Sequence, residues 1–266
     1  MREPTAKDIR VAPIKAADAA ALVRRVHYSG KVVQNSQLHL GVFLGDRLEG
    51  AMQFGPSLDK RKIQGLVEGT AWGGFIELNR MAFSDRLPRN SESRALGVAF
   101  RLLRKHYPHI EWVVSFADGT QCGDGTIYRA SGFLLTGIKP SVDLWHCPDG
   151  AVRHSMNFKN ARPTPIQRQV RQQLGMPTAS EGQLLRRWGA IPLPGFQLRY
   201  IYFLNPAARE RLTVPILPFS AIDEAGAKMY LGKPRRACSI EVDAPADQAG
   251  EGGSIPTHAL HLKGGH

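Results

Sequence analysis

The succession of elements predicted along the chain indicates an α/β fold with a mixed, mostly antiparallel sheet flanked by helices. A strand-like run at residues 9–14 precedes a helical run, and residues 38–55 form two apolar runs around a Gly45-Asp46 turn, typical of an antiparallel hairpin. A strand, a helix and another strand follow over residues 74–118. With 266 residues, 42% of them hydrophobic, the chain can bury one sizeable core or two small ones.

The first helix is predicted in KAADAAALVRRVHYSG, where apolar residues recur at helical spacing before a glycine ends the segment. The run GFIELNRMAF is predicted to be a strand whose residues alternate between two faces. That alternation puts Arg80 on the face of Leu78 and Ala82. A buried arginine is costly unless it is paired, so Arg80 is expected either to be functional or to pair with Glu77 or Asp118.

The next helix is predicted in RALGVAFRLLRKHYP, with Ser91 or Ser93 as its N-cap. EWVVSFAD then predicts a strand, and TIYRASGF predicts a helix of one or two turns that a glycine ends. Further on, AVRHSMNFK and FQLRYIYFLN predict strands around a basic helix in TPIQRQVRQQLG. The buried stripe of the longer helix is expected to consist of Leu96, Phe100, Leu103 and Tyr107.

Charge and composition divide the chain into three predicted parts. Residues 1–160 are expected to form a catalytic core, residues 161–241 a basic C-terminal segment that completes the fold and contacts nucleic acid, and residues 242–266 a flexible tail. The net charge is +12, and residues 151–240 contain 14 Lys and Arg against 4 Asp and Glu. Such a basic segment with interleaved aromatic residues fits a nucleic-acid groove, and equally a solvated face over core aromatics. The predicted phosphate contacts are Arg186, Arg187, Arg235 and Arg236.

Cysteine usage and the lack of long apolar segments bear on where the protein works. The three cysteines are widely spaced and form no CxxC pair, which favours a reducing cytoplasm over a disulfide framework or a zinc ribbon. The N-terminus lacks the apolar run of a signal peptide, and no window is apolar over the length that a membrane span needs. We therefore expect a cytoplasmic protein without a membrane partner.

Residues 115–133, SFADGTQCGDGTIYRASGF, combine a strand end, a glycine-rich loop and a short helix that displays Tyr128. IYRASGF resembles the LYxxxGF signature of the GNAT acetyltransferase fold, in which the tyrosine is a general acid toward the departing donor group. The order of elements over roughly residues 9–135 resembles the same fold, so a GNAT-like sheet is expected. One departure weakens the case for coenzyme A. The usual position of the glycine-containing phosphate loop reads RNSESR, and RALGVA fits that pattern about five residues late, inside the predicted helix.

Four separated segments resemble, in order and spacing, the phage Mom family of adenine-modifying proteins: HYSGKVVQNS, LGVF, ELNRMAF and SFADGTQCGDGTIYRASGF. The resemblance spans most of residues 24–160. It implies conversion of adenine in duplex DNA to an N6-carbamoylmethyl adduct, which hides phage DNA from host restriction enzymes. A phage-encoded member of the family would work in the cytoplasm of the host cell.

The resemblance points to five active-site residues, namely His27, Tyr28, Arg80, Asp118 and Tyr128. In the implied reaction Tyr128 is the general acid, Arg80 stabilises a developing oxyanion, and Asp118 or neutral His27 takes the proton from adenine N6. Because N6 is paired within the duplex, the target base is expected to flip into the site. Ordinary structural roles stay open for the same residues: a packing tyrosine, a turn aspartate and a histidine at a helix end.

A metal and a reactive cysteine are weaker hypotheses. His27 and Asp118 carry donor atoms that suit a non-haem iron, but no second histidine accompanies Asp118, so iron at these two residues is kept as a minority hypothesis. Cys122 lies in the glycine-rich loop, where no neighbouring base would activate its thiol.

The atoms of the implied product narrow the choice of donor. A carbamoylmethyl group contains a nitrogen that an acetyl donor lacks, and it is an isomer of a glycyl group. Glycyl-tRNA followed by a rearrangement therefore balances the atoms, and an acyl-CoA is the rival donor. A chain of net charge +12 is suited to bind tRNA as well as double-stranded DNA.

Two functions of other classes stay open at the level of sequence. One is a conventional GNAT acetyltransferase that acts on a protein or a small amine. The other is a DNA-binding protein without catalytic activity, which the basic C-terminal segment would allow. The sequence does not specify the oligomeric state or the recognised DNA context.

Overall fold

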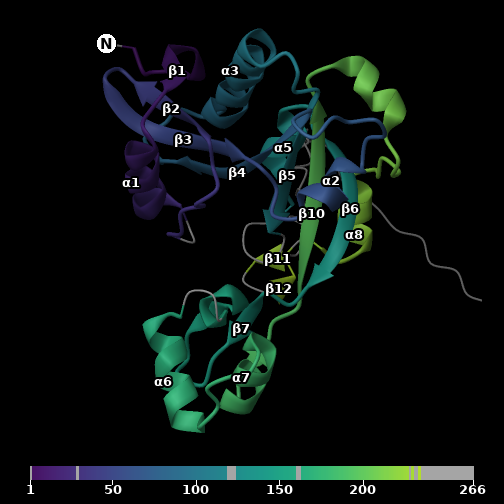
Figure 1. Cartoon of the computed structure of the whole chain (residues 1–266). Coiled ribbons are helices and arrows are strands. Elements are labelled where there is room, and N and C mark those ends of the chain that lie inside the picture. Colours follow the sequence, from purple (N-terminus) through teal and green to yellow (C-terminus); the bar gives the residue numbers. More distant parts are fainter. Residues whose placement is uncertain are drawn as a thin grey trace, which may run out of the picture. The chain divides into compact units, whose positions relative to one another are not determined.

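A seven-stranded sheet in the order β1-β2-β3-β4-β5-β10-β6 is the centre of the fold (Figure 1). The computed structural model describes residues 2–27, 30–118, 124–159, 163–227, 229–230 and 233–234. Neighbouring strands pair antiparallel, except that β4 and β5 are parallel. The predicted mixed, mostly antiparallel sheet is therefore confirmed. Its strands are β1 (Ile9–Pro13), β2 (Leu38–Leu44), β3 (Arg47–Gly55), β4 (Phe75–Phe83), β5 (Trp112–Asp118), β6 (Leu134–Ser141) and β10 (Gly195–Phe203).

Two long helices cover opposite faces of this sheet. α3 (Ser91–His106) contributes Leu96 and Phe100 to the main core, which also contains Met52 of β3. α1 (Ala16–Val26) contributes Leu22 to a smaller cluster with Ala51 of β3. Because Ala51 and Met52 are neighbours on one strand, they point to opposite faces of the sheet. None of the helices in the described residues is long and apolar enough to cross a membrane.

The ends of α3 differ from the predicted ones. Its N-cap is Asn90, which has φ 68° and makes no capping bond with its side chain, so the prediction of Ser91 or Ser93 as the cap is wrong. Ser91 instead lies inside the helix, where its hydroxyl donates to the Pro88 carbonyl at 2.6 Å. Tyr107 follows the helix and is 40% exposed, so it does not belong to the buried stripe.

Residues 142–194, between β6 and β10, form a part that we name the insertion lobe. It has its own sheet, in the order β8-β7-β9, and its own core of Trp145, Cys147, Phe158 and other apolar residues. AVRHSMNFK is thus a short strand followed by a 3-10 turn rather than one long strand, because His154 Nδ1 accepts the Met156 N–H at 3.1 Å. The elements of the lobe are β7 (Leu144–His146), β8 (Val152–His154), η2 (Ser155–Phe158), α6 (Pro165–Leu174), α7 (Glu181–Trp188) and β9 (Ile191–Pro192).

Strand β10 brings the basic C-terminal segment into the main sheet, between β5 and β6. Tyr200 and Ile201 on this strand are fully buried. Tyr200 is therefore a core residue, as in the alternative of a solvated basic face over core aromatics. The division into residues 1–160, 161–241 and 242–266 stays a prediction, since the tail lies outside the described residues.

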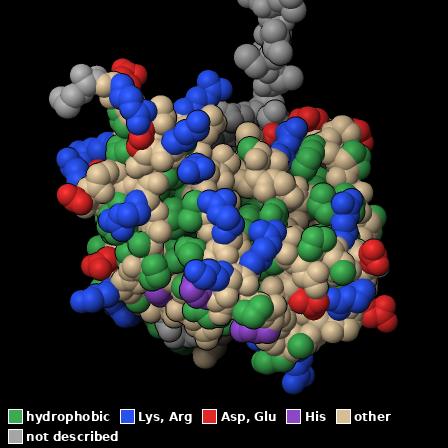
Figure 2. Space-filling model, turned by 90° about the horizontal axis from the view of Figure 1, so that it is seen from above, with side chains coloured by type: hydrophobic (Ala, Val, Ile, Leu, Met, Phe, Trp, Pro, Cys, Tyr) green, Lys and Arg blue, Asp and Glu red, His purple; other side chains and the backbone are tan. Residues whose placement is uncertain are grey.

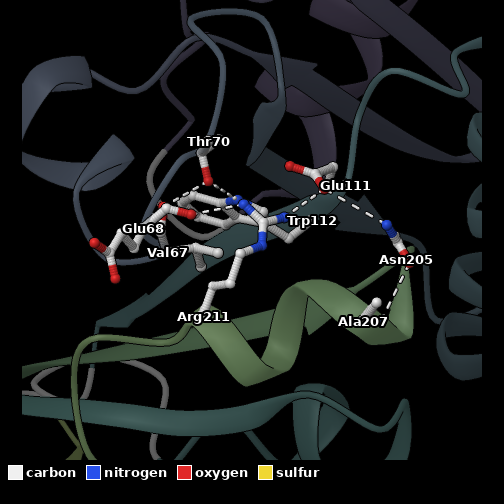
Figure 3. Close-up of polar contacts among 8 residues, drawn as sticks. All are labelled: Val67, Glu68, Thr70, Glu111, Trp112, Asn205, Ala207 and Arg211. Carbon is white, nitrogen blue, oxygen red and sulfur yellow. Dashed lines mark hydrogen bonds and ion pairs between the residues drawn. The ribbon is translucent and has the colours of Figure 1, made fainter.

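The short elements complete the described chain. A polar cluster fixes the segment that follows α2 to the start of β5 and to η3 (Figure 3). In it, Trp112 Nε1 donates to Thr70 Oγ1 at 3.0 Å, while Arg211 donates to the Glu68 carbonyl at 2.6 Å and to Glu111 at 2.5 Å. These elements are η1 (Ala6–Asp8), α2 (Lys60–Gln64), α5 (Thr126–Ala130), η3 (Pro206–Arg211), α8 (Ser220–Glu224), β11 (Met229–Tyr230) and β12 (Lys233–Pro234).

Candidate active site

The parallel strands β4 and β5 pair over three residues only and then separate. Their register ends at Glu77 and Val114, although both strands continue beyond that point. At the separation, Ser115 Oγ lies 3.1 Å from the Leu78 carbonyl and 2.9 Å from the Tyr128 hydroxyl. The Tyr128 hydroxyl therefore lies where the two strands part, an opening of the sheet at which backbone groups become available.

The glycine-rich loop ends in a turn that positions Tyr128. Gly125 is the N-cap of α5 with φ 70°, a conformation that side-chain-bearing residues rarely adopt. A Cβ atom at Gly125 would lie 2.8 Å from the Tyr200 ring, so glycine is also required for space. The Tyr200 hydroxyl in turn donates to the Asp124 carbonyl.

The ring of Tyr128 is packed while its hydroxyl reaches the strand separation. Its centroid lies 5.1 Å from that of Tyr200 and 5.2 Å from that of Phe133. Tyr128 is thus half-buried and fixed by aromatic contacts. The structural and functional roles considered for this residue are compatible with each other.

A β-bulge places Arg80 on the other face of the sheet from Leu78. Gln53 pairs with Arg80 while Phe54 pairs with Leu78, so Asn79 is an extra residue in β4. Leu78 and Phe54 belong to the α3-side core, and Gln53 points to the α1 side with Arg80. The prediction that Arg80 shares a face with Leu78 is therefore wrong. The bulge reverses the alternation that strict pairing would impose.

Arg80 lies among polar residues on the α1 side. Its Nε is buried, and no described residue accepts a hydrogen bond from it. The neighbouring Gln53 is 1% exposed and approaches His39 Nδ1 with its Nε2 at 3.1 Å, while its Oε1 has no partner among the described residues. A buried donor and a buried acceptor that lack partners are costly, and such groups are typical of sites that receive a ligand or ordered water.

The charge of Arg80 shifts the pKa values of the titratable residues near it. Burial, reinforced by that charge, lowers the pKa of His27 to about 4. The same two causes lower the pKa of Lys31. Burial raises the pKa of Glu77, and the Arg80 charge opposes that change. His27 is therefore a neutral imidazole at pH 7, the state that a general base requires.

Asp118 and Lys31 both interact electrostatically with His154 of the insertion lobe. Burial lowers the pKa of His154, the negative charges of Asp143 and Asp118 raise it, and the charge of Lys31 lowers it. Lys31 also donates a hydrogen bond to Asn157 of the lobe. Thus Lys31 interacts electrostatically with Arg80 on one side and with His154, near Asp118, on the other.

Of the predicted catalytic residues, the structure describes His27, Arg80, Asp118 and Tyr128, while Tyr28 lies outside the described residues. Leu78, whose carbonyl meets the Ser115–Tyr128 pair, is two residues from Arg80 along β4, or about 7 Å at the rise of a strand. Sequence reasoning missed Lys31 and His154. The signal for Lys31 was present, because it lies within HYSGKVVQNS.

The other predicted residues give a mixed result. Arg186 and Arg187 are exposed on α7, with the Arg186 guanidinium 5.8 Å from the Trp145 ring centroid. Cys122, Arg235 and Arg236 lie outside the described residues. Within the described part of the chain, no three His, Cys, Asp or Glu side chains gather as a metal site would require, so iron at His27 and Asp118 stays an untested hypothesis.

A cavity of about 420 Å³ lies at the start of α3, next to α5. It is lined by two carboxylates, Asp85 and Glu92, and by Arg89. Gly97 of RALGVA lies well inside α3, as expected, where the backbone amides are bonded within the helix. This helix start therefore offers acidic side chains, and no glycine loop, to an incoming phosphate.

Comparisons with known proteins agree with the segments discussed above. A model of the Mom protein family matches residues 8–221. The protein named methylcarbamoylase Mom from Escherichia phage Mu is 37% identical over 211 residues, which cover 79% of this chain and 81% of that protein.

Among solved structures, the ribosomal-protein-S18-alanine N-acetyltransferase from Escherichia coli matches 74% of this chain and 94% of its own, at 10% identity and a TM-score of 0.39. An IAA acetyltransferase from Bacillus cereus matches 73% of this chain and 99% of its own, at 10% identity and a TM-score of 0.41.

Proposed function

The chain belongs to the Mom protein family, and we propose that it is a transferase that converts adenine in double-stranded DNA to an N6-carbamoylmethyl adduct. The observation that carries the proposal is the buried Nε of Arg80, which has no hydrogen-bond partner among the described residues, close to neutral His27 and near the strand separation that Tyr128 reaches. The relative from phage Mu is named a methylcarbamoylase, which fits such an adduct. The modification would protect phage DNA from host restriction enzymes.

Each of these residues has a chemical role in the proposed reaction. Adenine N6 is a weak nucleophile, so neutral His27, or Asp118, takes its proton as the new bond forms. The Arg80 guanidinium stabilises the negative charge that develops on the donor carbonyl oxygen. Tyr128 gives a proton to the donor oxygen that leaves as the ester bond breaks. Lys31, whose charge interacts with that of Arg80, adds positive charge beside the carbonyl oxygen.

The donor that we favour is glycyl-tRNA. A bond forms between adenine N6 and the glycyl carbonyl carbon, and the ester bond to the tRNA hydroxyl breaks. The resulting glycyl amide and the carbamoylmethyl product contain the same atoms, so a rearrangement completes the reaction without another reactant. In it the bonds from N6 to the carbonyl carbon and from CH2 to the amine break, while bonds from N6 to CH2 and from the carbonyl carbon to the amine form. The two carboxylates of Asp85 and Glu92 outnumber Arg89 beside the start of α3 and disfavour the pyrophosphate of an acyl-CoA, which supports this choice.

The surface charge supports polyanionic partners. Lys and Arg side chains are spread over the face in Figure 2, whereas Asp and Glu side chains lie mainly toward its rim. With a net charge of +12, such a surface attracts both DNA and tRNA at long range.

Labelled donors test the proposal directly. Purified protein is incubated with duplex DNA and either glycyl-tRNA carrying labelled glycine or labelled acetyl-CoA, and the DNA is then digested to nucleosides. We expect label on adenosine only from glycyl-tRNA. Label from acetyl-CoA alone would favour the rival donor, and transfer from acetyl-CoA to a protein or an amine without DNA would favour a conventional acetyltransferase.

A further inference from the structure

An exposed apolar side chain follows a strand of the candidate active site. Leu58 is 89% exposed, while its neighbour Ser57 is buried. The backbone before it is held in place, because Asn35 donates to the Pro56 carbonyl at 2.7 Å and Gly55 pairs with Glu77 of β4. Leu58 is thus displayed three residues beyond the end of β3, the strand whose Gln53 pairs with Arg80.

Basic and aromatic side chains follow Leu58 on the segment 56–72, which we name the docking segment. Arg61 and Lys62 of α2 are exposed. Lys60 Nζ lies 4.3 Å from the ring centroid of Trp72, which is itself 56% exposed. Three cations follow the apolar tip within four residues, against the single exposed carboxylate of Asp59, and they are complementary to a phosphate backbone beside stacked bases.

The base of the docking segment is anchored in the core. Thr70 accepts a hydrogen bond from the buried Trp112 and donates to the Val67 carbonyl at 2.7 Å, as Figure 3 shows. Arg211 holds the Glu68 carbonyl from η3. Because its backbone is anchored in this way, the segment can hold a side chain in place against a partner.

We infer that the docking segment binds the DNA duplex, with Leu58 entering the base stack as a wedge and with Arg61 and Lys62 on phosphates. The inference rests on the proposed function, in which adenine must leave the stack. Unstacking costs a few kcal/mol, and enzymes that extrude bases or kink DNA often insert an apolar side chain to offset it. The place of Leu58 just beyond the strand that pairs with Arg80 favours DNA over tRNA, because the reacting ester at the end of a tRNA is single-stranded and needs no wedge.

Permanganate oxidation measures the wedge without any donor. A thymine whose adenine partner has left the stack becomes reactive, so the assay needs only protein and a long duplex of mixed sequence. We expect wild-type protein and Leu58→Met to raise thymine reactivity, and Leu58→Ser to bind DNA but to lower that reactivity by roughly tenfold or more. Ile191→Ser is the matched control, since Ile191 is 64% exposed and has no Lys or Arg within two residues.

Several outcomes would overturn the inference. They are a Leu58→Ser protein with full thymine reactivity, a wild-type protein that leaves thymines unreactive, or a Leu58→Ser effect on tRNA affinity alone. DNA that stays unmodified in expressing cells while thymines become reactive would instead contradict the proposed reaction and leave the wedge intact.

Salt dependence tests the phosphate contacts. Arg61→Gln with Lys62→Gln should reduce the slope of log affinity against log salt by about two units for every DNA sequence. Arg101→Gln with Lys105→Gln, an exposed pair on α3, should leave the slope unchanged. Equal slopes for the two double variants would place the DNA elsewhere.

Discussion

Replacing Tyr128 with phenylalanine distinguishes a chemical role of its hydroxyl from a packing role of its ring. Tyr128→Phe keeps the ring against Tyr200 and Phe133 and removes the contact of the hydroxyl with Ser115, worth about 1 kcal/mol of stability. We expect DNA modification to fall about 100-fold or more, because the general acid is lost. Tyr202→Phe, which removes a contact with Arg104, is the control and should keep activity. Full activity of the Tyr128 variant in a turnover assay would refute the general-acid assignment.

The low pKa of His27 predicts a pH dependence of stability. Its pKa is about 4 in the folded protein and 6.5 in the unfolded chain, so only the unfolded state takes up a proton between these values. The free energy of unfolding therefore falls as pH drops from about 6.5 toward 4, by on the order of 2 kcal/mol from this residue. His27→Gln should flatten that fall in urea titrations. An unchanged slope would mean that other groups, such as His39, cause it.

At the scale of elements, the turn before α5 is where a single methyl group should matter. Gly125→Ala forces a side chain into a left-handed conformation and against the Tyr200 ring, so we expect a loss of about 1–3 kcal/mol and displacement of Tyr128. Gly97→Ala inside α3 meets open space and should stabilise the helix by up to about 1 kcal/mol. Thermal unfolding and turnover of the two variants test this contrast. Similar behaviour would show that the turn is adaptable.

Local patterns predicted most elements, whereas long-range pairing determined what the sequence analysis missed. The hairpin of β2 and β3, strand β4 and helix α3 follow from turn residues and periodicity within each segment. The bulge at Asn79 depends on its partner Gln53, so alternation alone assigned Arg80 to the wrong face. Likewise, a strand pattern reveals nothing about insertion between β5 and β6, the position that β10 occupies.

At the scale of the whole molecule, the candidate site draws on segments distant in sequence. The resemblance identified His27, Arg80, Asp118 and Tyr128, because each lies in a recognisable motif. His154 was missed, since it enters through the insertion lobe and acts on the others only by charge. A sequence pattern records residue identity, but not which charges meet after folding.

The insertion lobe contains two of the predicted phosphate contacts, Arg186 and Arg187. Both Arg186 and Arg187 are exposed, so Arg186→Gln with Arg187→Gln should weaken DNA binding for all sequences and reduce the salt slope by about two units. Fluorescence anisotropy at several salt concentrations measures the slope, with the Arg101 and Lys105 double variant as the control. An unchanged slope would mean that these arginines face solvent in the complex.

The most direct test of the central claim is mass spectrometry of nucleosides from the DNA of cells that express the protein. Synthetic N6-carbamoylmethyl and N6-glycyl deoxyadenosine are isomers, so both are needed as chromatographic and fragmentation standards. We predict the carbamoylmethyl form with the wild-type protein, and its absence with an Arg80→Lys variant that folds normally. DNA with unmodified adenine in cells that contain folded wild-type protein, or a different adduct, would contradict the account.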